Sequence, residues 1–407
     1  MARILIVGPG QAGLQLALGL VHDGHDVTVV SNRTPEEIRD GKVMSSQCMF
    51  GAALQHEHEL GIDYWYDECP DIEGISLAVP DPSGGKMIDW AARLERPAQS
   101  VDQRLKMPVW MEKLEEAGGR VVIRDVGVPE LEEYVQDNDL VVVAAGKGDV
   151  AALFPRDAAR SPYDTPQRAL ALTYVTGMTS RPEYSAVCFN LIPTVGEYFV
   201  FPALTTSGSC EIMVFEGIPG GPMDCWKDVK SPQQHLEKSK WILDTFLPWE
   251  AERCRKVELT DANGILAGSF APTVRKPIGR LPSGKIVLGL ADAVVLNDPI
   301  TGQGSNNASK AAKVYLDAII AHGDRPFDAA FMQATFDRYW AYAQYVTGWT
   351  NALLQPPPPH VLKIMGSAQA YPMLARRIAN GFDNPPDLFP WFAVPEEADK
   401  YLQQLAA

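Results

Sequence analysis

The 407-residue sequence lacks the signals of membrane and secreted proteins. No stretch approaches the run of about 18 apolar residues that spans a bilayer. The N-terminus has no apolar segment followed by a small-residue cleavage site, as a signal peptide would. Six cysteines are scattered without a C-x-x-C pair, which is typical of free thiols in a reducing cytosol. We therefore expect a cytoplasmic protein with no membrane partner.

Positive charge is also scarce. Lys and Arg number 36 against 51 Asp and Glu, giving a formal net charge of −15. A chain with this charge and no basic block repels phosphate backbones, so no nucleic-acid partner is expected. The H-E-x-x-H, G-x-S-x-G and P-loop motifs are missing, which disfavours zinc proteases, serine hydrolases and P-loop nucleotidases. We interpret the one histidine cluster, His56-Glu57-His58, as a solvated helix face and predict no metal site.

The N-terminus does contain a glycine-rich turn within a β-α-β pattern. Residues 3–7 are typical of a buried parallel strand, an amphipathic helix follows from residue 14, and a second strand spans 26–30. The turn reads G-x-G-x-x-G, which permits a tight bend, close approach of a pyrophosphate and packing of helix on strand. The predicted nucleotide contacts are Gly8, Gly10, Gln11, Ala12 and Gly13.

The acidic residue that usually binds a ribose after the second strand is missing. Ser31, Asn32 and Arg33 stand there instead. Neutral Ser31 or Asn32 can still bond a hydroxyl, though less strongly than a carboxylate does. We include all three among the predicted cofactor contacts.

A second glycine-rich loop lies late in the chain. A buried strand at 285–290 leads to Asp292, and residues 298–307 then read D-P-I-T-G-Q-G-S-N-N before an amphipathic helix. A strand end, a glycine-rich loop and a helix N-terminus together favour an electron-rich ligand.

The remaining pattern predicts an α/β fold with two domains and a helical C-terminal region. Strand-like segments between 165 and 217 indicate a mostly antiparallel sheet inserted into a nucleotide-binding unit. We predict a discontinuous nucleotide-binding domain that comprises residues 1–164 and 260–325. A substrate-binding domain is predicted at 165–259 and a helical region at 326–407. Part of 45–100 is expected to line the substrate pocket.

Two distant glycine-rich loops around one sheet resemble the FAD-dependent hydroxylase fold, with a Rossmann-type FAD-binding domain. The chain is more closely similar, over essentially its whole length, to the two-component styrene and indole monooxygenases. The similar segments are V-D-Q-R-L at 101–105, A-G-G at 117–119, D-L-V-V-V-A-A-G-K at 139–147 and T-P-Q-R-A-L at 165–170.

The resemblance implies specific cofactor contacts. Asp292 would bind the ribityl hydroxyls, Pro299 would lie beside the isoalloxazine, and Gly302 and Gly304 would offer N–H groups to its pyrimidine edge. Lys42, where the family has an arginine, and Arg104 would lie near the cofactor, and the Val126 backbone would pair with adenine. The remaining implied contacts are Gly146, Gln303, Ser305 and Asn306.

The resemblance also implies the chemistry. Reduced FAD would act as co-substrate and react with O2 to give a C4a-hydroperoxide that epoxidises indole at C2=C3, yielding indoxyl and then indigo. No protein residue is assigned a covalent role. Only one nucleotide fingerprint is present, and Ala145-Gly146 stand where single-chain hydroxylases carry D-G. We therefore expect reduced FAD to come from a separate NADH-dependent flavin reductase, and a homodimer is left open.

Six pocket positions resemble the indole branch of the family, namely Ser45, Gln47, Met49, Ile72, Ile75 and Ala98. Burying an unpaired indole N–H costs about 1–3 kcal/mol, and Ser45 or Gln47 can accept that bond. Two alternatives stay open. One is the same enzyme class acting on styrene or other vinyl arenes, and the other is a non-enzymatic binding protein like the GDP-dissociation inhibitors, which the two intact loops disfavour.

Overall fold

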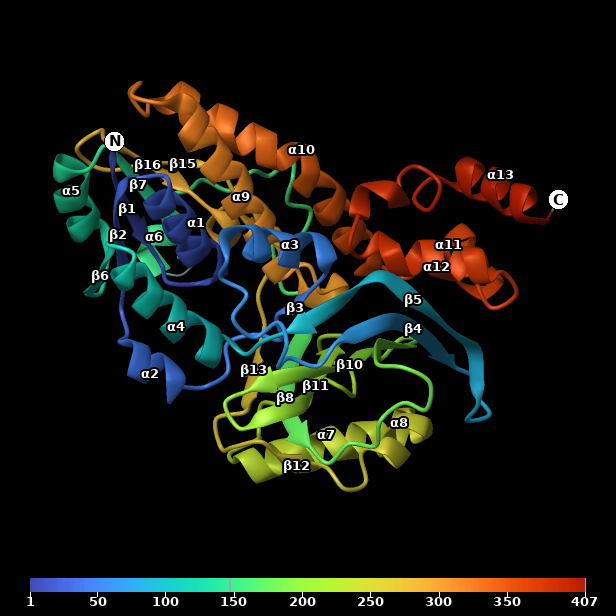
Figure 1. Cartoon of the computed structure of the whole chain (residues 1–407). Coiled ribbons are helices and arrows are strands. Elements are labelled where there is room, and N and C mark those ends of the chain that lie inside the picture. The colour runs from blue at the N-terminus through green and yellow to red at the C-terminus, as the bar shows by residue number, and fades with distance from the viewer. Residues whose placement is uncertain (146–147, 407) are drawn as a thin grey trace.

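Two β-sheets form the two lobes of the molecule, shown in Figure 1. The computed structural model describes residues 1–145 and 148–406. Over those residues, the first lobe has a six-stranded sheet of order β15-β16-β7-β1-β2-β6, and the second has a nine-stranded sheet. The predicted α/β class and the inserted, mostly antiparallel sheet are confirmed.

The first sheet is parallel except at its β15 edge. Its members are β1 (Arg3–Val7), β2 (Asp26–Ser31), β6 (Arg120–Ile123), β7 (Leu140–Val143), β15 (Ile278–Arg280) and β16 (Ile286–Gly289). Because β1, β7 and β16 run in parallel, their carboxyl ends lie at one edge of the sheet. The Ala144 amide donates to Val7 and the Leu290 amide to Val143, both at 2.8 Å. The two glycine-rich loops therefore start from the same edge.

Helices α1 (Gln11–His22) and α9 (Gly304–His322) follow those loops and pack on each other. The Gln15 amide donates to the Ser309 carbonyl at 3.1 Å, and the Tyr315 hydroxyl ties α9 to the Gly289 carbonyl at 2.8 Å. Further helices of this lobe are α2 (Pro35–Arg39), α3 (Gly51–Leu60), α4 (Gln103–Glu116), α5 (Val128–Asp137) and α6 (Gly148–Ala152).

The second sheet is larger than the sequence predicts. Its order is β12-β8-β11-β10-β9-β4-β5-β3, with β13 paired to β8. The predicted domain at 165–259 supplies β8 (Ala169–Thr176), β9 (Ala186–Ile192), β10 (Gly196–Thr205), β11 (Gly208–Gly217), α7 (Pro232–Phe246), α8 (Pro248–Arg253) and β12 (Glu258–Leu259). Residues outside it add β3 (Cys48–Met49), β4 (Ile72–Pro80), β5 (Lys86–Ser100) and β13 (Ile265–Gly268). Local patterns do not reveal which distant strand a segment joins.

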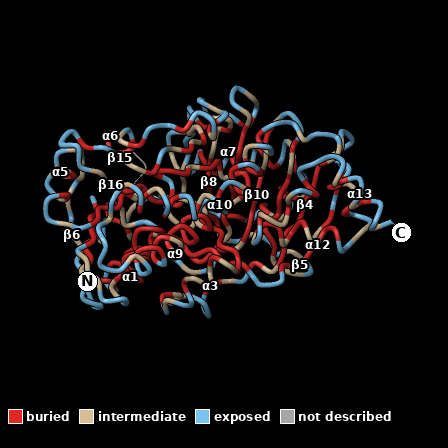
Figure 2. Tube along the Cα trace, turned by 90° about the horizontal axis from the view of Figure 1, so that it is seen from above, coloured by how far each residue is buried: buried red, intermediate tan, exposed pale blue. Residues whose placement is uncertain are grey.

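The C-terminal helices are α10 (Ala329–Leu353), α11 (Pro359–Ser367), α12 (Pro372–Gly381) and α13 (Pro395–Ala406), with the 3₁₀ turn η3 (Pro385–Leu388) between the last two. Helices α11 to α13 share one apolar core with β4 and β5, and the Trp90 indole donates to the Met365 carbonyl at 3.1 Å. Figure 2 shows buried residues concentrated along α9 and the strands, with exposed residues on outer helices such as α5. Helices α11 to α13 of the predicted helical region thus pack on the second sheet, while α10 packs on α9 of the first lobe.

Candidate functional site

The first loop, residues 8–13, has one glycine that the protein's own packing does not explain. Gly8 has φ +115°, and a Cβ on Gly13 would lie 2.0 Å from the Gly8 carbonyl oxygen, so neither tolerates a side chain. Gly10 is exposed, has φ −87°, and a Cβ there would meet no atom within 4 Å. Open space beside an uncapped helix N-terminus fits a phosphate group.

The other predicted residues of the first loop are held by the protein. Ala12 is 4% exposed and belongs to the core of the first lobe. The Gln11 amide donates to Glu57 at 2.8 Å and to Gln15 at 3.0 Å. Backbone N–H groups, rather than the Gln11 side chain, are what this loop offers to a ligand.

The second loop, residues 290–303, includes the turns η1 (Ala291–Ala293) and η2 (Pro299–Thr301), joined by β17 (Val295–Leu296), which pairs with β14 (Thr273–Val274). Gly302 has φ +63°, and a Cβ on Gly302 or Gly304 would meet no atom within 4 Å. Pro299 and Ser305 are half-buried. Helix α9 starts here without a side-chain cap, which repeats the arrangement at α1.

Three amide side chains surround the start of α9. Asn306 donates to the Cys48 carbonyl and accepts from the Phe50 amide, both at 2.8 Å, which fastens the start of α9 to β3 and the residue that follows it. The Gln303 amide donates to Phe382 at 2.8 Å. Among the described residues, the Gln303 oxygen and both polar atoms of Asn307 have no hydrogen-bond partner, although Asn307 is only 2% exposed. Buried amides without partners fit a bound polar ligand. Sequence reasoning missed Asn307, whose only signal is its place in the S-N-N run.

Asp292 lies at the carboxyl end of β16. It is closely surrounded by protein, and burial raises the pKa of its carboxyl to about 6 against the opposing charge of Arg275. Asp292 is nevertheless exposed to solvent. An exposed acceptor at that strand end suits the hydroxyls of a ribityl chain, and this contact stays a prediction.

The predicted ribose and adenine contacts lie at the same edge of the first sheet. The Ser31 hydroxyl donates to the Arg33 carbonyl at 2.5 Å, the Arg33 guanidinium contacts the Met44 sulfur at 3.1 Å, and Asn32 is exposed. Val126 is half-buried just after β6, which pairs with β2. These residues surround one edge, and their contacts with adenosine stay predictions.

Two further predicted contacts are less informative. Lys42 is exposed, so its role stays a prediction. Gly146 lies outside the described residues.

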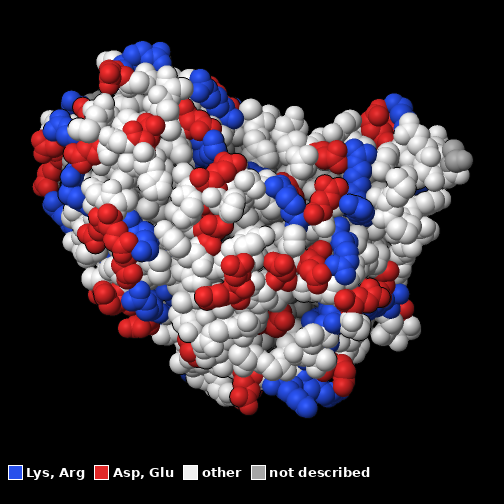
Figure 3. All heavy atoms as spheres, in the orientation of Figure 1, with Lys and Arg blue, Asp and Glu red and all other residues white. Residues whose placement is uncertain are grey.

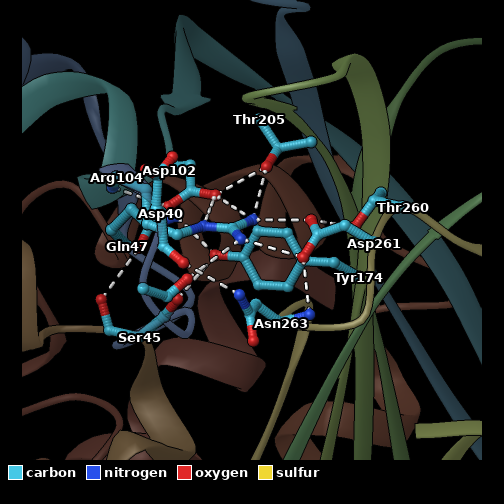
Figure 4. A network of polar contacts seen from close by, with 11 residues as sticks. Asp40, Ser45, Gln47, Asp102, Arg104, Tyr174, Thr205, Thr260, Asp261 and Asn263 are labelled. Carbon is cyan, nitrogen blue, oxygen red and sulfur yellow. Dashed lines mark hydrogen bonds and ion pairs between the residues drawn. The ribbon is translucent and has the colours of Figure 1, made fainter. Parts of the chain in front are cut away.

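Arg104 forms a polar network that joins the two lobes, shown in Figure 4. It is 2% exposed on α4, and its guanidinium donates to Asp102 at 2.9 Å, to both Asp261 oxygens at 3.1 Å and to Thr205 at 3.1 Å. Asp261 and Thr205 belong to the second lobe. Its hydrogen-bonding capacity is thus largely used by the protein, and a direct cofactor contact stays a prediction.

The polar residues of the predicted pocket also bond to one another (Figure 4). Gln47 has φ +34°, its oxygen accepts from Ser45 at 2.9 Å, and its amide donates to the Tyr174 hydroxyl at 2.8 Å. Tyr174 in turn donates to the Ser45 carbonyl at 2.7 Å, and Gln103 donates to the Ser45 hydroxyl at 3.0 Å. Tyr174 and Gln103 were not predicted, because partners 129 and 58 residues away from Ser45 leave no local signal.

The four apolar residues of the predicted pocket are at most 1% exposed: Met49, Ile72, Ile75 and Ala98. Ile72 pairs with Ala98 across β4 and β5. Ile72, Ile75 and Ala98 share an apolar core with Ile300 of the second loop. Three of the four thus belong to the same core as a residue of the second loop, and their contact with substrate stays a prediction.

The interpretation of His56-Glu57-His58 as a solvated helix face is wrong for its central residue. Glu57 is 2% exposed and pairs with Lys106 at 2.7 Å, while also accepting from Gln11. A charged residue on a helix can face the interior when it pairs with a buried cation there. The sequence does not show that Lys106 is that cation.

Other sequence expectations concern metals, thiols and membranes. In the part of the chain that the structure describes, no cluster of three or more His, Cys, Asp or Glu is arranged to hold a metal. The six cysteines are free thiols. Among the same residues, no helix combines the length and apolar character needed to cross a membrane.

Comparison with known proteins decides the family. Residues 146–253 match the family described as "Styrene monooxygenase A putative substrate binding domain". Styrene monooxygenase StyA of Pseudomonas fluorescens is 30% identical over 99% of this chain and 98% of its own. The chain belongs to the styrene monooxygenase family. StyA of an unspecified Pseudomonas has the same identity and coverage. The predicted family is thereby confirmed, without a decision between its styrene and indole branches.

Solved structures confirm the fold of this styrene monooxygenase family member. The flavin-dependent brominase Bmp2 aligns over 99% of both chains with a TM-score of 0.65 at 14% identity. A flavoprotein/dehydrogenase from Cytophaga hutchinsonii aligns over 100% of both chains with a TM-score of 0.68 at 13% identity. These alignments show the fold, while membership of the styrene monooxygenase family makes the protein an FAD-dependent monooxygenase.

Proposed function

We propose that this chain is the oxygenase component of a two-component flavoprotein monooxygenase that epoxidises a vinyl arene such as styrene. The observation that carries this choice is the closed set of hydrogen bonds among Ser45, Gln47, Tyr174 and Gln103. A pocket rejects an analogue that leaves its buried polar groups unpaired. Here the protein pairs those groups itself, so a hydrocarbon substrate leaves none of them unmatched. The names of both StyA relatives support the same substrate class.

Indole is the second candidate. The six pocket positions resemble the indole branch, and the Ser45 and Gln47 oxygens each keep acceptor capacity beyond the bonds they already make. An indole N–H would have to compete for that capacity with the existing network, which favours styrene.

FAD fits the site because the described residues offer backbone N–H groups, unpartnered amide groups and open space for it. The N-terminus of α1 beside Gly10 would hold the pyrophosphate, Asp292 the ribityl hydroxyls, and the start of α9 with Asn307 the ring system. When bound in reduced form, FAD supplies the two electrons with which O2 delivers one oxygen atom to the alkene and one to water.

The chain's own contribution is to position the substrate and exclude water. Buried apolar side chains, Met49, Ile72, Ile75 and Ala98, suit a dry lining that holds an aromatic ring and its vinyl group near the second loop. No protein nucleophile is required, and we assign no covalent role to any residue.

The electrons are proposed to come from a separate NADH-dependent flavin reductase, as the single nucleotide fingerprint suggests. On the face in Figure 3, acidic and basic side chains are interspersed. Among the described residues, that face presents no block of one charge that would steer a reductase to it. The scattered free thiols support a cytoplasmic location.

The test compares both substrates with the purified protein, chemically reduced FAD and O2. We expect styrene oxide to form with a higher kcat/KM than the indoxyl that gives indigo. A higher value for indole would favour the second candidate, and no oxygenated product from either would refute the proposed activity. The double variant Ser45→Ala, Gln47→Val separates the two further, because only an indole-binding role predicts a large shift in the substrate preference.

A further inference from the structure

Two glutamates lie side by side on adjacent strands of the second sheet. Glu197 of β10 is the register partner of Glu216 of β11. Successive side chains of a strand point to opposite faces of the sheet, so Glu216 lies on the same face as Ile212 and Val214. The apolar core on that face also includes Ile300 of the second loop. Like charges directly opposite each other on adjacent strands are destabilising, so this pair needs compensation.

A third carboxyl meets them from the second loop. Asp298 is 2% exposed and its Oδ1 accepts from the Ile300 amide at 3.1 Å, which shapes the turn η2. Its Oδ2 and both oxygens of the fully buried Glu216 find no hydrogen-bond donor among the described residues. The carboxyls of Glu216 and Asp298 lie within hydrogen-bonding contact of each other.

The nearby cation, Arg168, already forms an ion pair with Glu197. Arg168 binds Glu197 through two bonds of 2.7 and 2.9 Å, and its Nη1 donates to the Gln167 and Leu354 carbonyls. Arg168 thus neutralises Glu197. Among the described residues, no cation bonds to the touching carboxyls of Glu216 and Asp298. Two buried carboxylates in contact cannot both ionise, and burial accordingly raises the pKa of each.

We propose that Glu216 and Asp298 share one proton, and that this proton holds the second loop against the substrate-binding sheet. Both act as positioning residues, since Asp298 also shapes the turn that carries Pro299. The charged groups facing the pair are Glu197 from β10 and Arg168 from the segment before β8. From α10, neutral Thr347 donates to Asn297 at 3.0 Å and neutral Thr350 bonds to Thr301 at 2.7 Å.

The consequence is a pH-dependent cofactor site, which rests on the assignment of FAD to the second loop. Once the shared proton is lost, two buried negative charges face each other and push the loop from the sheet. FAD affinity is then expected to fall tenfold per pH unit above the pKa of the pair, because binding requires the protonated form.

The first experiment detects the proton itself by infrared spectroscopy of the full-length protein, titrated from neutral to alkaline pH. We expect the C=O band of a buried protonated carboxylic acid in the wild type at the neutral end and its loss in Glu216→Gln. The matched control is Glu211→Gln, on the same strand but the opposite face of the sheet. Burial raises the pKa of Glu211 to about 7, so the control removes any band of Glu211 itself and keeps the band of the pair. A band unchanged in Glu216→Gln overturns the proposal.

The second experiment measures FAD affinity from neutral to alkaline pH. In the Glu216→Gln variant, the side-chain amide that replaces the carboxyl donates permanently to Asp298. We therefore expect affinity near pH 7 within about threefold of the wild type and no alkaline loss. The wild type and Glu211→Gln should both lose affinity as the pH rises. Equal pH profiles for the wild type and Glu216→Gln overturn the coupling to the loop. If the wild type binds no FAD at any pH, the proposed function fails, while the infrared band still decides whether the proton is shared.

Discussion

Replacing Gly10 by alanine should separate cofactor binding from folding. A Cβ on Gly10 meets no protein atom within 4 Å, and its φ of −87° suits any residue. We therefore expect the apoprotein to fold with an unchanged melting temperature. The new methyl group nevertheless occupies the space in which a pyrophosphate must approach the start of α1.

The size of the effect follows from the bonds that the displaced phosphate loses. A hydrogen bond to a charged group contributes about 1.5–3 kcal/mol. Losing one such bond weakens FAD binding by about 10- to 150-fold, since 1.4 kcal/mol corresponds to a factor of ten. Isothermal titration calorimetry with FAD and thermal unfolding of the apoprotein measure the two quantities separately.

Gly13→Ala is the matched control in the same loop. Its Cβ would lie 2.0 Å from the Gly8 carbonyl oxygen, so the backbone must shift, at a cost of about 1–3 kcal/mol. This variant should lower the melting temperature of the apoprotein itself. Wild-type FAD affinity in Gly10→Ala, or a destabilisation as large as that of Gly13→Ala, would refute the reasoning.

Three further predictions follow from the site. Burial raises the pKa of Asp292 to about 6, so its contribution to apoprotein stability is complete below the unfolded value near 3.8 and is lost as the pH rises through about 6. FAD affinity should rise over the same interval as the carboxylate forms, and titrations should find that rise absent in Asp292→Asn. Arg104→Met leaves buried Asp102 unpaired and should lower the free energy of unfolding by about 3–5 kcal/mol in urea titrations; a loss below about 1 kcal/mol would contradict the bridging role. NADH alone should not bleach bound FAD anaerobically, and rapid reduction without a reductase would count against a separate reductase.

The first lobe could be predicted from the sequence because its signals are local. A buried strand, a glycine-rich turn and an amphipathic helix are contiguous at residues 3–22, and the same order recurs around residue 304. The parallel arrangement of such units then brings both loops to one edge of the sheet. This is why the positions of Gly10 and Asp292 relative to the first sheet agree with the sequence analysis.

Contacts between residues far apart in the sequence could not be predicted in the same way. The hairpin of β4 and β5 joins β9 across more than a hundred residues, and Arg104 meets Asp261 from 157 residues away. Buried ion pairs such as Glu57 with Lys106 look like ordinary surface charges in sequence. Their partners are set by tertiary packing, which leaves no periodic signal.

The central claim is that the first and second loops bind one FAD together, and calorimetry of the apoprotein with oxidised and with reduced FAD tests it most directly. We predict one-to-one binding that is weakened both by Gly10→Ala in the first loop and by Gly304→Ala at the start of α9, where a Cβ also meets no protein atom within 4 Å. The absence of any heat of binding with either oxidation state, or insensitivity to one of the two substitutions, would contradict it.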